Sequence, residues 1–327
     1  MPLFIVGHPR SGTKLLRGLL NRHPEIAIPE IETTFLPYWA DHWPEYGDLS
    51  DRDIFHKFVD TVGGLPFFQY EKEYGNPIDE EQWFRNCRAF TVQGVFEALV
   101  RVAVGIGDTE IGYWGDKSPS YLTKTPVIKS LFPDAKIIHI VRDVRDCCLS
   151  NKKAFGKNIF RTAQRWTSEI TKARDAFEMY SADVLELRYE DLLANAGKEL
   201  RRVCEFLSLP FKKEMCTLLR PVEFRGDARH SASIVSSNTG KYLTEMSPRT
   251  LRRIESIAQP ILDAYGYELA NAVSYRPLRD WQMSVLKFLD ALNLIRKSEA
   301  EKGGVVGAIR FHIRHHRIAT DRSPNNR

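Results

Sequence analysis

The sequence lacks several features that would place a protein in a membrane or outside the cell. No apolar run approaches the roughly 20 residues that a membrane-spanning helix needs. The opening apolar stretch is short and has no basic leader, so no secretory signal is expected. The five cysteines are an odd number without a Cys-x-x-Cys pair, which argues against a disulfide framework or a metal cluster. These absences predict a cytoplasmic protein with reduced thiols.

A large excess of one charge is also missing. The chain has 47 Lys and Arg against 42 Asp and Glu, a formal charge of +5 over 327 residues. This mild basicity suits an anionic ligand, but it is far from the clustered basicity of nucleic-acid-binding proteins, and we expect no nucleic-acid partner. Hydrophobic residues make up 43% of the chain, enough for a sizeable core in one large domain or two small ones.

The apolar pattern predicts an α/β fold. Short apolar runs indicate strands at residues 3–6, 26–28, 137–141 and 184–187. Helical spacing is found at 15–20, from about 144, over 163–177, over about 193–207 and from 248, where Ser-Pro is a good helix start. Strands that alternate with helices predict a parallel sheet with helices on both faces.

Two parts of the chain depart from this alternation. From 33 to about 115 the signals are mainly helical, and Trp and Tyr are frequent. We interpret this part as a helical insertion whose aromatic side chains serve either as core or as the wall of a pocket. The part from 271 to 327 combines a predicted helix with a basic tail.

The C-terminal helix carries an apolar stripe that suits a core contact, a subunit contact or a membrane surface. The stripe consists of Trp281, Val285, Phe288, Leu289, Leu292 and Ile295. In the tail, His312, His315 and His316 have a spacing that a metal ion could use on a helix. No acidic or cysteine partner accompanies them, so no metal site is predicted.

A glycine-flanked loop, Gly7–Lys14, separates the first strand from the first helix. Glycines let backbone N–H groups approach a phosphate closely, and the N-terminus of the following helix adds partial positive charge. Arg10 adds a guanidinium suited to phosphate or sulfonate oxygens, and Thr13 adds a hydroxyl. The loop therefore predicts a phosphate site.

The same loop departs from the nucleoside triphosphatase pattern Gly-x-x-x-x-Gly-Lys-Ser/Thr. Lys14 comes one place late, and Leu15 stands where a Mg²⁺-binding hydroxyl is needed. A kinase or NTPase is thus disfavoured but kept as an alternative. A second alternative is a nucleotide-binding module without catalysis.

The segment Pro9–Thr13 resembles the 5′-phosphosulfate loop of the sulfotransferases that use 3′-phosphoadenosine 5′-phosphosulfate (PAPS). In that family Lys or Arg stands at the position of Arg10, followed by Ser/Thr-Gly-Thr, and Lys14 replaces a usual second threonine. The resemblance is to the bacterial and tyrosylprotein branches. It implies a P-loop-like three-layer fold, a central parallel sheet flanked by helices. It also implies that Arg10, Ser11, Gly12, Thr13 and Lys14 bind the donor.

Further segments match the same family. Arg142, at the end of a predicted strand, and Ser150, eight residues later, resemble the 3′-phosphate site. Tyr189 matches the tyrosine that contacts the adenine, although a tyrosine in the core is the alternative. Lys241 lies in a segment that resembles the loop closing over the nucleotide, and Ser231 or Ser233 could lie close to it.

The catalytic residues are implied by the same resemblance. Glu32 matches the glutamate base, with Glu30 as a close competitor and His8 as a distant third. Lys117 is similar to a lysine that, with Arg10, stabilises the transferring and leaving oxygens. A surface lysine paired with its neighbouring aspartate is the alternative for Lys117.

The expected activity is therefore in-line transfer of a sulfuryl group from PAPS to a hydroxyl or amine, releasing adenosine 3′,5′-bisphosphate without a metal. The acceptor remains open among carbohydrate, lipid, small alcohol, phenol and peptide. The expected organisation is a sulfotransferase domain at 1–270, with the insertion at about 33–115 on its acceptor side, and an extension at 271–327. A homo-oligomer or weak membrane-surface contact is considered for the extension.

Overall fold

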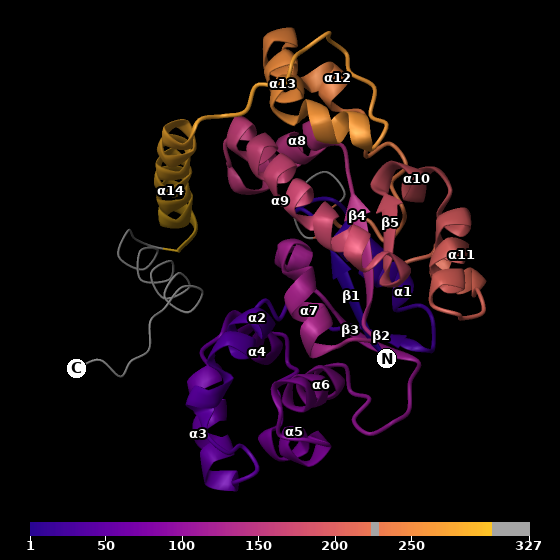
Figure 1. Ribbon diagram of the computed structural model, residues 1–327, viewed down its shortest axis with the longest axis vertical. Coiled ribbons are helices and arrows are strands. Elements are labelled where there is room, and N and C mark those ends of the chain that lie inside the picture. Colours follow the sequence, from indigo (N-terminus) through magenta and orange to yellow (C-terminus); the bar gives the residue numbers. More distant parts are fainter. Residues whose placement is uncertain (224–228, 303–327) are drawn as a thin grey trace.

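A five-stranded, fully parallel sheet forms the centre of the molecule (Figure 1). The computed structural model describes residues 1–223 and 229–302, with side chains up to 293. The strand order is β2-β3-β1-β4-β5. Their bounds are β1 Pro2–Val6, β2 Ile26–Ala27, β3 Tyr113–Lys117, β4 Lys136–Val141 and β5 Val184–Arg188.

Helices cover both faces of this sheet, because its central strands are apolar on both sides. In β1, Phe4 and Val6 pack into one core cluster, while Leu3 and Ile5 pack into the other. The second cluster is covered by α1 (Thr13–Leu20), α10 (Tyr189–Ala194) and α11 (Ala196–Phe206). The first is covered by α7 (Thr125–Leu131), α8 (Val144–Phe155), α9 (Ile159–Met179) and α13 (Pro248–Ala264). The predicted three-layer α/β fold is confirmed.

Helices α2 to α6 lie between β2 and β3 in the chain and form the lower part of Figure 1. They span α2 Leu36–His42, α3 Arg52–Val62, α4 Pro66–Glu73, α5 Glu80–Asn86 and α6 Val92–Ala103. Trp39 and Trp83 are fully buried here, with ring centroids 6.3 Å apart, and Phe58 packs on both. These aromatic side chains therefore form core and do not line a pocket.

Two elements differ from the sequence-based expectation. The helix expected over about 193–207 is two helices, because Asn195 interrupts it and caps α11 by accepting from the Lys198 N–H at 3.0 Å. The strand β3 has no apolar signature, since its last two residues are the buried polar pair Asp116 and Lys117. It begins inside the segment expected as insertion.

All five strands run in the same direction, so the segments that follow them meet at one edge of the sheet. Val6, Lys117, Val141 and Arg188 are the last residues of β1, β3, β4 and β5. Because β1 lies between β3 and β4, the chain changes direction across the sheet at β1, which is where open α/β sheets bind ligands. The glycine loop leaves β1 at this point.

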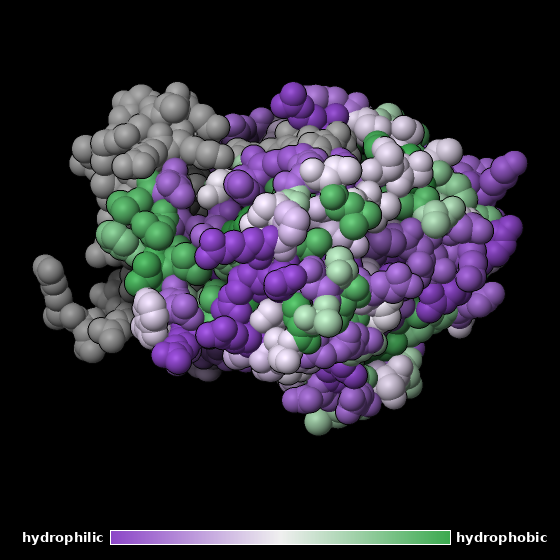
Figure 2. Space-filling view, turned by 90° about the horizontal axis from the view of Figure 1, so that it is seen from above, coloured by the Kyte–Doolittle hydropathy of each residue, from purple (hydrophilic) through white to green (hydrophobic). Residues whose placement is uncertain are grey.

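The last described helix, α14 (Asp280–Lys302), lies beside the main body (Figure 1). Its outer side belongs to the apolar area at the left of Figure 2. No helix among residues 1–223 and 229–302 is both long and apolar enough to cross a membrane. Residues His312, His315 and His316 lie outside the described part of the chain.

Candidate functional site

A cavity that is partly open to solvent lies at the carboxyl edge of the sheet. Six of the residues predicted from sequence line it, namely Arg10, Gly12, Arg142, Ser150, Tyr189 and Lys241, and Ser231 and Ser233 line it as well. Residues from five separate parts of the chain thus meet at one cavity.

The glycine loop has a backbone that brings it close to the cavity wall. Arg10 and Gly12 have φ values of 77° and 97°, in the left-handed region. A Cβ on residue 12 would lie 2.3 Å from the Tyr189 ring, so only glycine fits there. Gly12 then begins α1, whose N-terminus points into the loop.

Arg10 connects the loop to α8 and to a later segment. Its Nε donates to Ser150 Oγ at 3.0 Å, and its Nη1 donates to Glu223 Oε2 at 2.9 Å. The pairing of Arg10 with Ser150 brings the two predicted phosphate positions side by side. Glu223 was not expected here, since it lies in an irregular segment with no motif.

Arg142 is almost fully buried under the cavity. Its Nη groups donate to the carbonyl oxygens of Arg10 at 3.2 Å and of Asn238 at 2.7 Å. Its guanidinium lies 4.4 Å from the centroid of the Tyr189 ring, and the Tyr189 hydroxyl accepts from Asn238 Nδ2 at 2.8 Å. The Nε of Arg142 is buried without a hydrogen-bond partner among the described residues.

Tyr189 is both a core residue and part of the cavity wall, the two positions considered for it from the sequence. It is 4% exposed and belongs to the core beside α10, yet one side of its ring lines the cavity. Burial raises the pKa of its hydroxyl, so that hydroxyl stays neutral near pH 7. A flat ring held by Arg142 and Asn238 at a cavity wall is a suitable surface for a nucleobase.

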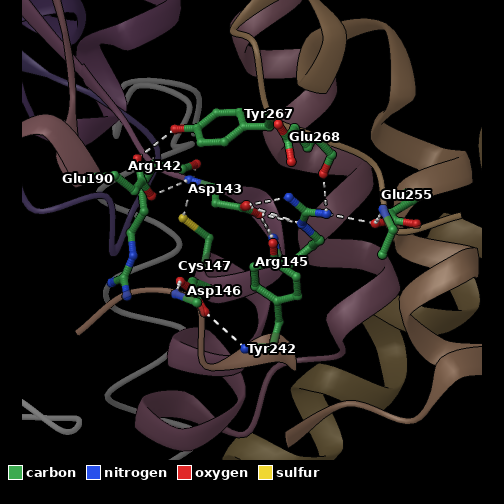
Figure 3. A network of polar contacts seen from close by, with 12 residues as sticks. Arg142, Asp143, Arg145, Asp146, Cys147, Glu190, Tyr242, Glu255, Tyr267 and Glu268 are labelled. Carbon is green, nitrogen blue, oxygen red and sulfur yellow. Dashed lines mark hydrogen bonds and ion pairs between the residues drawn. The ribbon is translucent and has the colours of Figure 1, made fainter. Parts of the chain in front are cut away.

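A polar network behind the cavity holds the segment that carries Lys241 (Figure 3). Asp146, on α8, accepts from the backbone N–H of Gly240 at 2.7 Å and of Tyr242 at 3.2 Å. These two bonds flank Lys241 and fix its backbone at the cavity rim. Sequence analysis missed Asp146, although residues 146, 150 and 153 recur on one face of α8 and all line the cavity.

The same network continues to the far side of α8. Arg145 pairs with Asp143 at 2.7 Å and with Glu255 of α13 at 2.7 Å, and it donates to the Glu268 carbonyl at 2.9 Å. Asp143 also caps α8 by accepting from the Arg145 N–H. These buried pairs fix the end of β4, which positions Arg142.

The two proposed catalytic side chains, Glu32 and Lys117, contact each other as an ion pair. The Lys117 side chain has no exposed area, while the Glu32 side chain is 35% exposed. Burial lowers the pKa of the Lys117 ammonium. The charge of Glu32 raises this pKa, and the positive charges of Arg17 and Lys14 lower it. Lys117 is therefore no surface lysine.

Asp116 does not neutralise its neighbour, contrary to the alternative considered for Lys117. It is fully buried and accepts from the Thr33 N–H at 3.3 Å, directly after Glu32 in the chain. Burial raises the pKa of its carboxyl to about 6. Asp116 thus supports the backbone that carries Glu32.

The competitors for the base lie in different surroundings. Glu30 pairs with Arg220 and Arg17 on the outer side of the loop, and its own carbonyl accepts from Arg17. His8 is 2% exposed and its Nδ1 lies 2.6 Å from a carboxylate oxygen of Glu169. Burial lowers the pKa of His8. Glu30 thus shares the buried Arg17 with the exposed Arg220, whereas the cation that Glu32 contacts is Lys117.

Three residues of the predicted loop do not line the cavity. Ser11 is fully buried with its Oγ 3.7 Å from Cys147 Sγ, and Thr13 is 4% exposed. Lys14 is partly exposed and lies near enough to Lys117 to affect its pKa. Their donor-binding roles stay predictions.

Among residues 1–223 and 229–302, no group of three or more His, Cys, Asp or Glu side chains is arranged to hold a metal ion. The described cysteines at the site are buried thiols, and burial raises the pKa of Cys147 to about 12. The expectation that no metal takes part stays a prediction.

Comparison with known proteins gives a consistent family. The model of the sulfotransferase family matches residues 2–213. Protein-tyrosine sulfotransferase A of Caenorhabditis elegans is 29% identical over 226 residues, covering 64% of this chain and 50% of that protein. An omega-hydroxy-beta-dihydromenaquinone-9 sulfotransferase of Mycobacterium bovis is 26% identical over 314 residues, covering 82% of this chain and 75% of that protein. The chain thus spans half the length of the first of these relatives.

A solved structure shows the same fold. The sulfotransferase domain from the curacin biosynthetic pathway superposes with a TM-score of 0.55 at 21% identity, covering 82% of this chain and 99% of that domain. The matched family model includes the glycine loop, Glu32, Lys117, Arg142 and Tyr189. It ends before the segment of Lys241.

Proposed function

The chain belongs to the sulfotransferase family, and from this premise we propose that it transfers a sulfuryl group from PAPS to a hydroxyl acceptor. The observation that carries the proposal is the meeting of Arg10, Ser150, Arg142 and Tyr189 at one cavity. The Glu32–Lys117 pair does not line this cavity, but the charge of Lys14 in the glycine loop acts on Lys117. The two arginines suit a ligand with more than one anionic group. The ring of Tyr189 on the same cavity wall suits a base.

The residues present fit this donor. Arg142 keeps a buried Nε without a partner among the described residues, and its other nitrogens are held by backbone oxygens. Arg10 and Lys153 add positive charge at the same cavity, and the helix α1 begins there. In this proposal Arg142 and Ser150 bind the 3′-phosphate. The loop of Arg10 binds the 5′ end.

PAPS supplies a sulfuryl group that is already activated by its bond to phosphate. Glu32 orients the acceptor hydroxyl and takes its proton as the acceptor oxygen bonds to sulfur and the sulfur–phosphate oxygen bond breaks. Lys117 and Arg10 stabilise the negative charge that develops on the bridging oxygen. Because Lys117 is buried, its charge acts in a region of low dielectric, where it is stronger than in water.

The ion pair has a second role in this scheme. Its contact with Lys117 holds the Glu32 carboxylate in one position. The ammonium is held beneath it by burial, whereas the carboxylate is on the exposed side. Glu32 is therefore the member of the pair that can reach an acceptor.

The relatives support a hydroxyl acceptor over an amine. By their names, one acts on protein tyrosine and another on an omega-hydroxy dihydromenaquinone, and both groups are hydroxyls. We propose the same acceptor group here and leave its carrier open between peptide and lipid.

The proposal is tested by transfer of labelled sulfur from PAPS to a panel of tyrosine peptides and hydroxylated lipids. Glu32→Gln should lower kcat by roughly 10²–10⁴-fold, because the general base is lost. Its affinity for adenosine 3′,5′-bisphosphate, measured by calorimetry, should stay within about twofold. Glu30→Gln is the matched control, two positions away, and should keep kcat within about threefold.

Full activity of Glu32→Gln would exclude Glu32 as the base. Tight binding of Mg·ATP by a protein that ignores adenosine 3′,5′-bisphosphate would instead support the kinase alternative and overturn the proposed donor. The calorimetric arm separates these two results because it needs no acceptor.

A further inference from the structure

The outer face of α14 is a continuous apolar stripe exposed to solvent. Its residues and exposed fractions are Trp281 62%, Val285 49%, Phe288 64%, Leu289 44% and Leu292 39%. At about 100° per residue, these five positions fall within an arc of about 100° on the helix. Apolar patches of this kind on a monomer mark contact sites more often than chance.

The orientation of this face is fixed by contacts on the opposite side of the helix. Asp290 accepts from the Asn158 N–H at 2.7 Å and pairs with Arg161 at 2.8 Å. Both partners lie at the start of α9, and Asp290 is largely shielded by them. The apolar face therefore points away from the body, where Figure 2 shows it as a hydrophobic area.

The net positive charge of the chain belongs, in sequence, to the extension that carries α14, and most of it to residues 303–327, which lie outside the described part of the chain. Residues 271–327 contain 11 Lys and Arg against 5 Asp and Glu, a net charge of +6. Subtraction from the totals leaves 36 basic and 37 acidic residues in 1–270, a net charge of −1. All of the positive excess thus belongs to the extension that contains the stripe.

We propose that α14 docks this chain on an anionic phospholipid surface. An apolar stripe that begins with Trp buries itself at the interface between headgroups and acyl chains, and neighbouring basic residues are attracted to anionic lipids. The combination matters, because one weak anchor alone gives marginal and reversible binding.

A second copy of the chain is the less suitable occupant. Two stripes packed against each other would bring two extensions of charge +6 together, and this repulsion opposes association. An anionic lipid surface can bury the apolar face of α14 and also attract the basic residues of the extension.

Helix α14 is held at the start of α9, the helix that follows α8 in the chain. Asn158 and Arg161 follow directly after α8, which carries Ser150 and Lys153 of the cavity wall. The inference concerns binding alone and does not depend on sulfuryl transfer.

The test is co-sedimentation of the full chain with vesicles of phosphatidylcholine, with and without phosphatidylglycerol. The wild-type chain should bind the anionic vesicles at least about tenfold more tightly, and added salt should weaken this binding. Trp281→Ser/Phe288→Ser should lose on the order of tenfold in affinity, because two large interfacial side chains are removed. Arg310→Gln/Arg314→Gln/Arg317→Gln should weaken binding to anionic vesicles alone.

The matched control is Tyr74→Ser/Met179→Ser, which removes two equally exposed apolar side chains far from α14 in sequence, 67% and 73% exposed. It should bind as the wild type does. Unfolding temperatures and the affinity for adenosine 3′,5′-bisphosphate show that each variant is folded.

Three results would overturn the proposal. The first is equal binding to neutral and anionic vesicles, or none to either. The second is unchanged binding of Trp281→Ser/Phe288→Ser. The third is self-association, measured by light scattering, that this variant abolishes, since the face would then join copies of the chain.

Discussion

Asp116 shows how a single buried carboxyl can link the stability of this protein to pH. Its Oδ1 accepts from Thr33, whereas its Oδ2 is buried without a partner among the described residues. The nearby charge of Glu32 adds to the effect of burial. The side chain therefore resists ionisation at the place where it supports the base.

We predict that Asp116→Asn changes the pH dependence of stability. The pKa of Asp116 is raised from 3.8 to about 6 on folding, so between these values the folded chain keeps a proton that the unfolded chain has lost. Stability then falls as pH rises through this window, by on the order of 3 kcal/mol, and the loss is complete above it. Asn cannot ionise and should show no such loss.

Denaturant unfolding at about pH 4 and about pH 7 measures this effect. The unfolding free energy of Asp116→Asn relative to the wild type should rise between these pH values. The exposed Asp134→Asn serves as control. A difference between variant and wild type that is constant with pH would show that Asp116 ionises normally.

At the level of elements, the connection between α8 and the segment of Lys241 depends on one carboxylate. Asp146 accepts two backbone N–H groups of that segment and lines the cavity itself. Arg142 holds the same segment through the Asn238 carbonyl. Together they tie the segment of Lys241 to α8 and to the end of β4.

We predict that Asp146→Asn weakens donor binding more than it affects stability. Asn keeps the shape but turns one acceptor oxygen into a donor that faces a backbone N–H, which removes one charge-assisted hydrogen bond. The affinity for adenosine 3′,5′-bisphosphate should fall by about tenfold or more in calorimetry.

Asp263→Asn, an exposed change on α13, is the control and should leave this affinity unaltered. If Asp146→Asn binds the nucleotide as well as the wild type does, the segment is placed by other contacts.

The elements predicted from sequence were those with a strong apolar period. The apolar side chains of β1, β4 and β5 and the leucines of α1 pack into the two cores. Their spacing predicts these elements without knowledge of the tertiary structure. The strand β3 is hidden because it ends in buried Asp116 and Lys117. Functional sites are where the local pattern is expected to fail, since polar side chains are buried there for chemistry.

The candidate site was accessible to sequence analysis only in part. Arg10, Arg142 and Ser150 lie in motifs with recognisable spacing, and the structure brings them to one cavity. Glu223 and Asn238 come from irregular segments, and no periodicity marks them. Their positions follow from tertiary contacts with Arg10 and Arg142.

For the whole molecule, the ion pairs around Arg145 join α8, α13 and the segment after α13. Glu255 has no exposed area, pairs with Arg145 and accepts from the N–H groups of Ala270 and Asn271 at 2.9 and 3.1 Å. The Glu255 carboxylate thus connects its own helix, α13, with α8 and with the segment after α13.

We predict that Glu255→Gln strongly destabilises the chain. Gln leaves Arg145 with Asp143 as its remaining counter-ion and turns one acceptor oxygen into a donor that faces a buried donor, at a cost of about 2–4 kcal/mol. The unfolding temperature should fall by roughly 3–6 °C, measured by circular dichroism.

Glu268→Gln is the control for this prediction, because Glu268 contacts Arg145 only through its backbone carbonyl and its side chain is exposed. It should melt with the wild type. If Glu255→Gln has the same unfolding temperature as the wild type, solvent reaches the ion pair and screens its charges.

The contact between Arg10 and Glu223 has a consequence for selectivity. The Glu223 carboxylate already pairs with the Arg10 guanidinium. Any anion that binds to Arg10 therefore has to compete with a carboxylate of the same chain. A tethered group acts as if it were present at millimolar concentration or more. Free sulfate or phosphate, which has one point of attachment, competes poorly. Under the proposed function, a nucleotide would also contact Arg142 and Tyr189 and gain from several simultaneous contacts, so Glu223 would disfavour small ions relative to the nucleotide.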